Sequence, residues 1–116
     1  MRLMKVALAS LLMLALLVTL ALAVTANVDK KEYVCMMQDM VLGKAGIPIQ
    51  FAGKTYYGCC EMCKEKLRKD AKSRFALDPV SKKRVDKASA LIGADPNGKV
   101  YYFESAENLK KFRAGS

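Results

Sequence analysis

The second half of this chain repeats the pattern of the first half, and this repetition constrains the fold more than any other feature. The segment Lys54–Leu67 aligns without a gap with Lys99–Phe112, which lies 45 residues further along the chain. Upstream, Val34-Cys35 corresponds to Val80-Ser81, with the spacing one residue out of step. Self-similarity at such a period is typical of tandem copies of one supersecondary unit. We therefore expect two units of about 40 residues each, near residues 32–75 and 77–114.

Each unit carries the same predicted elements, namely a short extended segment, a β-hairpin and a helix. Turn residues mark both hairpins, because Ala52-Gly53 and Asp95-Pro96-Asn97-Gly98 tolerate a positive φ or preset a turn. We expect extended segments at Tyr33–Met36 and Pro79–Val80, hairpin strands at Ile47–Phe51, Lys54–Tyr57, Ala90–Ile92 and Val100–Phe103, and helices at about 60–74 and 106–113. The predicted fold class is α+β.

Finer signals place the helices and the joint between the units. Leu67, Ala71 and Phe75 recur at helical spacing and predict one apolar face on the first helix. Ser105 suits the N-cap of the second helix. The segment Leu77–Pro79 is the predicted joint, because a proline disfavours helix in the residue before it. We expect Tyr101–Phe103 to be core residues of a strand rather than a binding patch.

The N-terminus has the order of a secretory signal. Arg2 and Lys5 form a basic start, and the uncharged apolar run Val6–Val24 follows. Small residues place candidate cleavage sites at Ala23 and Ala26. We expect residues 1–26 to be a signal peptide, cleaved near Ala26, and the mature chain to be periplasmic. A retained membrane anchor stays open, because a span needs roughly 20 apolar residues.

Composition narrows the function. Removing Arg2 and Lys5 lowers the formal net charge from +9 to +7. A basic chain suggests nucleic acid, but export removes that partner and leaves anionic lipid, an acidic protein or simple solubility. The chain has no histidine, which excludes histidine metal ligands and histidine-based catalytic triads. We see no hydrolytic or phosphate-binding motif and do not expect an enzyme.

The four cysteines form the strongest chemical signal. Cys59, Cys60 and Cys63 cluster where a predicted strand runs into a helix, and Cys35 lies on the first extended segment. Either Cys59 or Cys60 can share a helical face with Cys63. The positive end of a helix lowers thiol pKa values, and thiolate is the form that binds metal. Geometry alone leaves both pairs open, with Cys35 folding back across the hairpin.

Methionine follows cysteine along the chain. All four methionines beyond the apolar run lie within five residues of a cysteine, and the second unit has none; these are Met36, Met37, Met40 and Met62. Thioether and thiolate donors together suit Cu(I). The alternative is that the methionines fill irregular gaps in the core.

These residues resemble two related families. The segment Tyr56–Leu67, with Cys35 upstream, resembles the TRASH domain, and Asp78–Val80 with Gly98–Phe103 resembles the YHS domain. The resemblance covers nearly all of the mature chain and divides it into a TRASH-like unit at 27–76 and a YHS-like unit at 77–116. It implies small treble-clef-like metal-binding modules associated with heavy-metal sensing, transport and resistance, above all for copper.

The resemblance also implies a ligand set. The family pattern is one cysteine on the first segment and a Cys-x-x-x-Cys at the helix start. Carried over, it nominates Cys35, Cys59 and Cys63, with Cys60 as a reserve thiol. The second unit departs from this pattern, because Ser81, Glu104 and Asn108 stand at the three cysteine positions. Serine and asparagine bind soft metals poorly, so we expect that unit to be a metal-free structural repeat.

Three functions remain in contention. The first is binding of one Cu(I) or Zn(II) ion per chain for metal trafficking, buffering or sensing, together with a metal-delivery or membrane transport protein. The second is an exported structural or interaction domain stapled by two disulfides, since exported thiols oxidise readily. The third is a thiol–disulfide oxidoreductase that uses Cys60 and Cys63, although no βαβ pattern precedes this CxxC.

Overall fold

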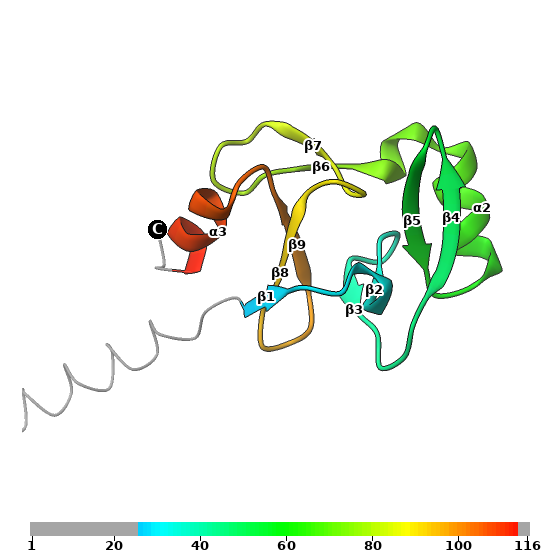
Figure 1. Cartoon of the computed structure of the whole chain (residues 1–116), viewed down its shortest axis with the longest axis horizontal. Coiled ribbons are helices and arrows are strands. Elements are labelled where there is room, and N and C mark those ends of the chain that lie inside the picture. Colours follow the sequence, from blue (N-terminus) through cyan, green and yellow to red (C-terminus); the bar gives the residue numbers. More distant parts are fainter. Residues whose placement is uncertain (1–25, 114–116) are drawn as a thin grey trace, which may run out of the picture.

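The computed structural model describes residues 26–113. The predicted signal peptide therefore lies outside the described residues, apart from Ala26. Within 26–113, no helix is long and apolar enough to cross a membrane. Figure 1 shows the hairpin of strands β4 and β5 with helix α2 at one end, and strands β8 and β9 with helix α3 at the other. The structure is a small α+β fold in which hairpins are followed by helices, as the sequence predicted.

The first half of the fold contains two strand pairs and a helix. Its elements are η1 (Lys31–Tyr33), β2 (Val34–Cys35), β3 (Met40–Val41), β4 (Ile47–Phe51), β5 (Lys54–Gly58), α2 (Glu61–Lys69) and η2 (Ala71–Arg74), where η denotes a 3-10 turn. Strand β2 pairs antiparallel with β3, and β4 pairs antiparallel with β5. The hairpin turn is as predicted, because Ala52 and Gly53 have φ values of 51° and 75°.

The second half repeats this order. Its elements are β6 (Phe75–Leu77), β7 (Arg84–Asp86), β8 (Leu91–Ala94), β9 (Val100–Phe103) and α3 (Ala106–Arg113). Strand β6 pairs with β7, and β8 pairs with β9. The N-terminal strand β1 (Ala26–Val28) adds to the free edge of β8 and makes a three-stranded sheet. The predicted N-cap of the last helix is confirmed, since the Ser105 hydroxyl accepts a hydrogen bond from the Asn108 N–H.

The first helix is shorter than predicted, and Asp70 is the reason. Helix α2 ends at Lys69, and Asp70 leaves the helical region with φ −100° and ψ 107°. Its carboxylate accepts the Lys72 N–H at 3.1 Å, which starts a new turn in place of the helix. The Arg74 guanidinium then donates to the Leu67 carbonyl at 2.8 Å and closes the helix end. The prediction of one continuous helix over about 60–74 was therefore wrong.

The prediction of an extended segment at Pro79–Val80 was also wrong. These residues form the turn between β6 and β7, and the strand lies earlier, at Phe75–Leu77. The Asp78 side chain builds the turn, because its Oδ1 accepts the N–H groups of Val80 at 2.7 Å and Ser81 at 3.2 Å. An aspartate that caps backbone groups two and three residues later favours a turn over a strand.

One hydrophobic core joins the two halves. Buried residues from the first half pack with buried residues from the second; the set is Val34, Met36, Ile49, Tyr56, Leu67, Val85, Ala90, Ile92, Val100 and Tyr102. Phe103 is also fully buried, so the expectation of core strand residues at Tyr101–Phe103 is confirmed for Tyr102 and Phe103, whereas Tyr101 is only partly buried. Because the core is continuous, residues of the second half can hold segments of the first half in place.

Candidate metal centre

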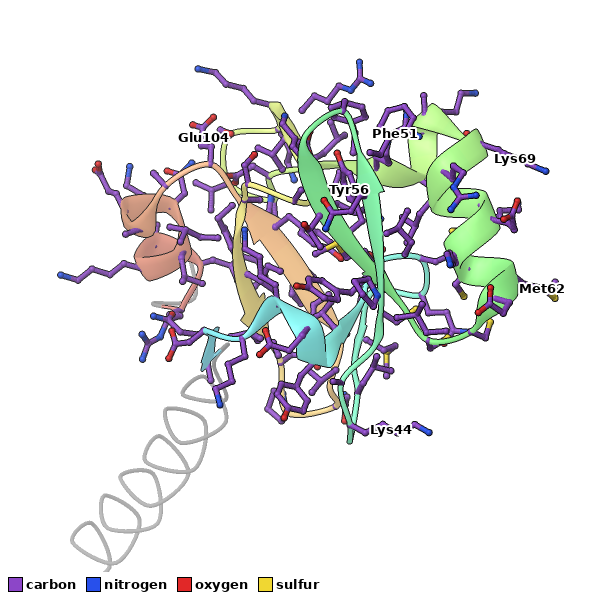
Figure 2. All side chains as sticks on the ribbon, turned by 45° about the vertical axis from the view of Figure 1, so that its right-hand side comes forward. Lys44, Phe51, Tyr56, Met62, Lys69 and Glu104 are labelled. Carbon is purple, nitrogen blue, oxygen red and sulfur yellow. The ribbon has the colours of Figure 1, made fainter. Side chains whose placement is uncertain are left out.

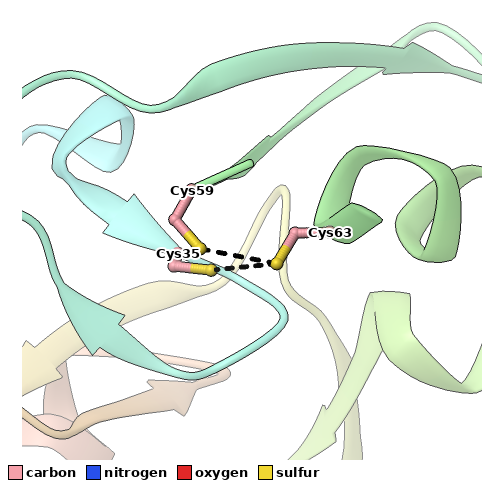
Figure 3. Close-up of side chains that lie close together, drawn as sticks. All are labelled: Cys35, Cys59 and Cys63. Atoms are coloured by element: carbon pink, nitrogen blue, oxygen red, sulfur yellow. Dashed lines mark hydrogen bonds between the residues drawn. The ribbon is translucent and has the colours of Figure 1, made fainter. Parts of the chain in front are cut away.

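Three cysteines from separate segments converge on one point. Cys35 ends strand β2, Cys59 follows strand β5, and Cys63 lies in the first turn of α2. Figure 3 shows their side chains pointing toward one another. The predicted folding back of Cys35 onto the helix start therefore occurs, and the sequence reasoning named all three residues of this group.

The sulfur positions fit a single soft metal ion. The Cys63 Sγ lies 3.4 Å from the Cys59 Sγ and 4.0 Å from the Cys35 Sγ. All three sulfurs lie within 4.8 Å of one another. Thiolates bound at about 2.3 Å to one ion stand about 3.8–4.0 Å apart in tetrahedral or trigonal geometry. Small side-chain rotations would bring the three sulfurs to these separations.

A glycine allows the helix to approach the strand this closely. Gly58 ends β5 beneath the first turn of α2, where a Cβ atom would lie 3.0 Å from the Cys63 Cβ and 3.3 Å from the Lys64 nitrogen. A larger residue at this position would push the helix start away. The Met36 N–H also donates to the Tyr57 carbonyl at 2.9 Å, which ties the segment after Cys35 to the strand before Cys59.

The pKa values of the three thiols are shifted in different directions. Burial tends to raise the pKa of Cys35, but the N–H groups of Gln38 and Met37 outweigh it and lower that pKa below its ordinary value. Hydrogen bonds to Cys63 and Cys35 raise the pKa of Cys59 to about 12. Burial likewise raises the pKa of Cys63. The cluster therefore has one thiol with a lowered pKa and two with raised pKa values, and a metal ion would have to displace the protons of the latter two.

Cys60 stands at the edge of this group. It occupies the N-cap position of α2, and its Sγ lies 3.4 Å from the Cys63 Sγ. The Cys63 backbone N–H lowers the pKa of Cys60, and hydrogen bonding to the Cys63 thiol lowers it further. Cys60 is exposed, whereas Cys35 is fully buried and Cys63 is 6% exposed. It is not among the three sulfurs that all lie within 4.8 Å.

The methionines divide between two environments. Met36 is fully buried in the core, which is the gap-filling role that the sequence left as the alternative. Met62 is 81% exposed on the first turn of α2, next to Cys63 in sequence. Figure 2 shows its side chain pointing outward at that end of the helix.

The second half of the chain holds the loop that carries Cys35. Lys87 is buried, and its ammonium donates to the Met36 carbonyl at 2.5 Å and to Asp39 Oδ1 at 3.1 Å. The Tyr102 hydroxyl donates to the same carboxylate oxygen at 2.8 Å. Sequence reasoning missed this network, because a lysine and an aspartate 48 residues apart give no periodic signal.

The structure also corrects the residue that matches Cys35 in the second half. The sequence alignment placed Ser81 there, but the backbone places Asp78. The Asp39 N–H donates to the Cys35 carbonyl, and the Lys82 N–H donates to the Asp78 carbonyl, each at 2.8 Å. Asp39 and Lys82 both have a positive φ, and β6 and β7 pair just before this loop as β2 and β3 do. A difference in loop length hid this match in the alignment.

The three matching residues of the second half bond to one another. Asp78 Oδ2 accepts the Glu104 N–H at 2.9 Å and the Asn108 side-chain amide at 3.0 Å. That amide also donates to Glu104 Oε1 at 3.2 Å. Burial tends to raise the pKa of Asp78, but these bonds and those from the turn lower it below its ordinary value. A buried carboxylate with this many donors needs no metal ion to balance it.

Comparison with family models, with curated proteins and with solved structures finds no match to this chain. The resemblance to the TRASH and YHS domains rests on the motif residues alone. What the structure establishes is a group of three cysteines, Cys35, Cys59 and Cys63, that is able to hold one metal ion.

Proposed function

We propose that this protein binds one soft metal ion, Cu(I) or Zn(II), through Cys35, Cys59 and Cys63, and that it serves in metal trafficking, buffering or sensing. The observation that carries the proposal is the convergence of three thiols, two of them buried, whose sulfurs all lie within 4.8 Å of one another. Thiolate ligands select soft and borderline ions over Mg²⁺ or Ca²⁺.

The arrangement favours a metal over two disulfides. Cys35, Cys59 and Cys60 all have their sulfur within 4.0 Å of the Cys63 sulfur. Cys63 can join only one disulfide, so a second bridge must form between two of the other three. A single metal ion would bind Cys35, Cys59 and Cys63 at once. The same convergence supports a metal site over a CxxC oxidoreductase, which needs two thiols rather than three.

The wider setting of the proposal follows the sequence. We propose that the chain is exported to the periplasm, with the signal peptide cleaved near Ala26, and that it is not an enzyme. A metal-delivery or membrane transport protein is the partner that such a carrier requires. The two halves would be TRASH-like and YHS-like treble-clef units, of which the first alone holds metal. N-terminal sequencing that returns Met1 from a soluble cytoplasmic fraction would refute the export.

The test is Cu(I) and Zn(II) binding to anaerobically purified protein. Native mass spectrometry should show one metal per chain, and Cys59→Ser and Cys63→Ser should each remove most of the affinity, because two sulfurs hold the ion less well than three. The matched control is Glu104→Gln at the position equivalent to Cys59, which keeps the oxygen that Asn108 bonds. Two tightly bound metals per chain, or full affinity in both cysteine variants, would contradict the proposal.

A further inference from the structure

The buried group and its exposed neighbour differ in access to solvent. Cys35 is fully buried and Cys63 is 6% exposed, so a molecule that carries a metal ion cannot contact these two sulfurs directly, and Cys59 is only partly exposed. Cys60 is exposed, and its Sγ is 3.4 Å from that of Cys63. Cys60 is therefore an exposed thiol that lies within bridging distance of a buried ligand.

Soft metal ions move between proteins by ligand exchange. Thiolates bind Cu(I) strongly, so the ion stays bound to sulfur while one sulfur replaces another. Such an exchange needs an acceptor thiol that an incoming molecule can reach. It also needs a second protein sulfur close enough to share the ion with the first. Cys60 and Cys63 meet both requirements.

We propose that Cys60 is the exchange thiol through which a soft metal ion passes between an external thiol-bearing molecule and the group of Cys35, Cys59 and Cys63. The inference rests on the proposed function and adds the route by which the ion arrives and leaves. The external molecule is identified by its chemistry: it presents Cu(I) on thiolate sulfur at an exposed surface.

The exchange conserves charge and oxidation state. A bond forms between the ion and the Cys60 thiolate while one external sulfur leaves. The Cys63 thiol then loses its proton to water and binds the ion as the remaining external sulfur leaves. Cys59 and Cys35 bind next, and each gives up to water any proton that it carries. The bond to Cys60 breaks last, and Cys60 takes up a proton or stays a thiolate. Copper remains Cu(I) throughout, so no oxidant or reductant is required.

The surface around Cys60 suits this role. Met62 lies two residues away on the same turn of α2 and is 81% exposed (Figure 2). A large apolar side chain that is this exposed gains nothing from packing in the free protein. Its thioether offers a second, weaker soft donor beside Cys60. An incoming metal complex would therefore meet one thiol and one thioether before it reaches the buried sulfurs.

The experiment measures the equilibrium affinity for Cu(I) separately from the rate of Cu(I) transfer. Cu(I) affinity is measured by competition with bicinchoninic acid, and transfer is followed by stopped flow after mixing apo protein with Cu(I)–glutathione, anaerobically. Cys60→Ser should keep its affinity within about threefold and slow transfer by about tenfold or more, because access to a thiolate sets the exchange rate. Cys60→Met, which keeps a soft donor at the same place, should recover part of the rate.

The other outcomes each decide against the inference. If Cys60→Ser loses affinity as fully as Cys59→Ser, Cys60 is a resident ligand. If transfer keeps its wild-type rate, the ion arrives elsewhere, and the cavity of about 370 Å³ beside Cys59, lined by residues 42–47, becomes the route. If the wild-type protein binds neither Cu(I) nor Zn(II), the proposed function itself fails, and the affinity measurement shows this before any rate is compared.

Discussion

Lys87 offers the sharpest test of how the second half of the chain supports the metal site. Its side chain is 6% exposed, and its ammonium donates to the Met36 carbonyl and to the Asp39 carboxylate. These two acceptors lie on the loop that begins at Cys35 and that Tyr102 also bonds. Lys87→Met removes the charge and keeps most of the apolar stem, so the core changes little in volume.

The expected cost follows from the two lost bonds. A buried carbonyl that loses its donor costs about 1–3 kcal/mol. The pair with Asp39 adds less than a fully buried pair, because the Asp39 side chain is 37% exposed and water replaces part of the interaction. We expect Lys87→Met to lower the free energy of unfolding by about 2–4 kcal/mol.

Part of this loss of stability should also appear as weaker Cu(I) binding. A loosened loop must be ordered again when Cys35 binds an ion, and ordering one backbone residue costs about 1–2 kcal/mol. Cu(I) affinity should therefore fall by about tenfold, which corresponds to about 1.4 kcal/mol. Urea unfolding followed by tyrosine fluorescence gives the stability, since the chain has five tyrosines and no tryptophan. Competition with bicinchoninic acid gives the affinity.

The matched control is Lys110→Met on the exposed face of α3, which removes the same charge at the surface. It should change the free energy of unfolding by less than about 0.5 kcal/mol. The reasoning is refuted if Lys87→Met behaves like this control. If stability falls by the expected amount but the Cu(I) affinity stays at the wild-type value, the loop does not need Lys87 to present Cys35.

Two further predictions concern close packing and pH. Gly58→Ala should weaken Cu(I) binding by about tenfold and lower the free energy of unfolding by about 1–3 kcal/mol, because the new Cβ would lie 3.0 Å from the Cys63 Cβ. The control is Gly43→Ala, whose Cβ would have no atom within 4 Å and which should change neither quantity. The pKa of Asp78 is lowered from its ordinary value of 3.8, so its contribution to stability is present above about pH 4 and is lost as the pH falls towards its folded pKa. Urea unfolding at pH 7 and pH 3 should show a smaller acid-induced loss in Asp78→Asn than in the wild type, and equal losses would show that the Asp78 bonds do not set its pKa.

Local signals in the sequence predicted both hairpins and both helix starts, with the first-half hairpin placed most accurately. The hairpin turn at Ala52-Gly53 depends only on the positive φ values of these two residues. Ser105 caps the last helix by accepting the N–H of Asn108, three positions later. Both are short-range effects that a sequence reports directly. The convergence of the cysteines was predictable for a similar reason, since Cys59 lies just before the helix whose first turn carries Cys63, and Cys35 precedes the same hairpin.

The features that the sequence did not predict depend on partners distant in the sequence, or on a side chain that competes with the local secondary structure. Asp70 stopped the first helix because its own carboxylate bonded Lys72, although the apolar spacing continued to Phe75. Strand β1 was missed because its partner, β8, lies more than 60 residues away. Lys87 reads as one more surface cation in a basic chain until the fold places it beneath the Cys35 loop.

The two halves of the chain balance charge differently at the same point of the fold. In the first half, Cys35, Cys59 and Cys63 form a group that becomes strongly anionic when its thiols ionise, and a metal cation would balance that charge. In the second half, Asp78 supplies one buried charge, and the donors from Glu104 and Asn108 balance it without a cation. The second half is therefore complete without metal. Because the core is shared, it also holds the loop of Cys35 in position without a metal. A site ordered in this way would bind a metal ion without first folding around it, which lowers the entropic cost of binding.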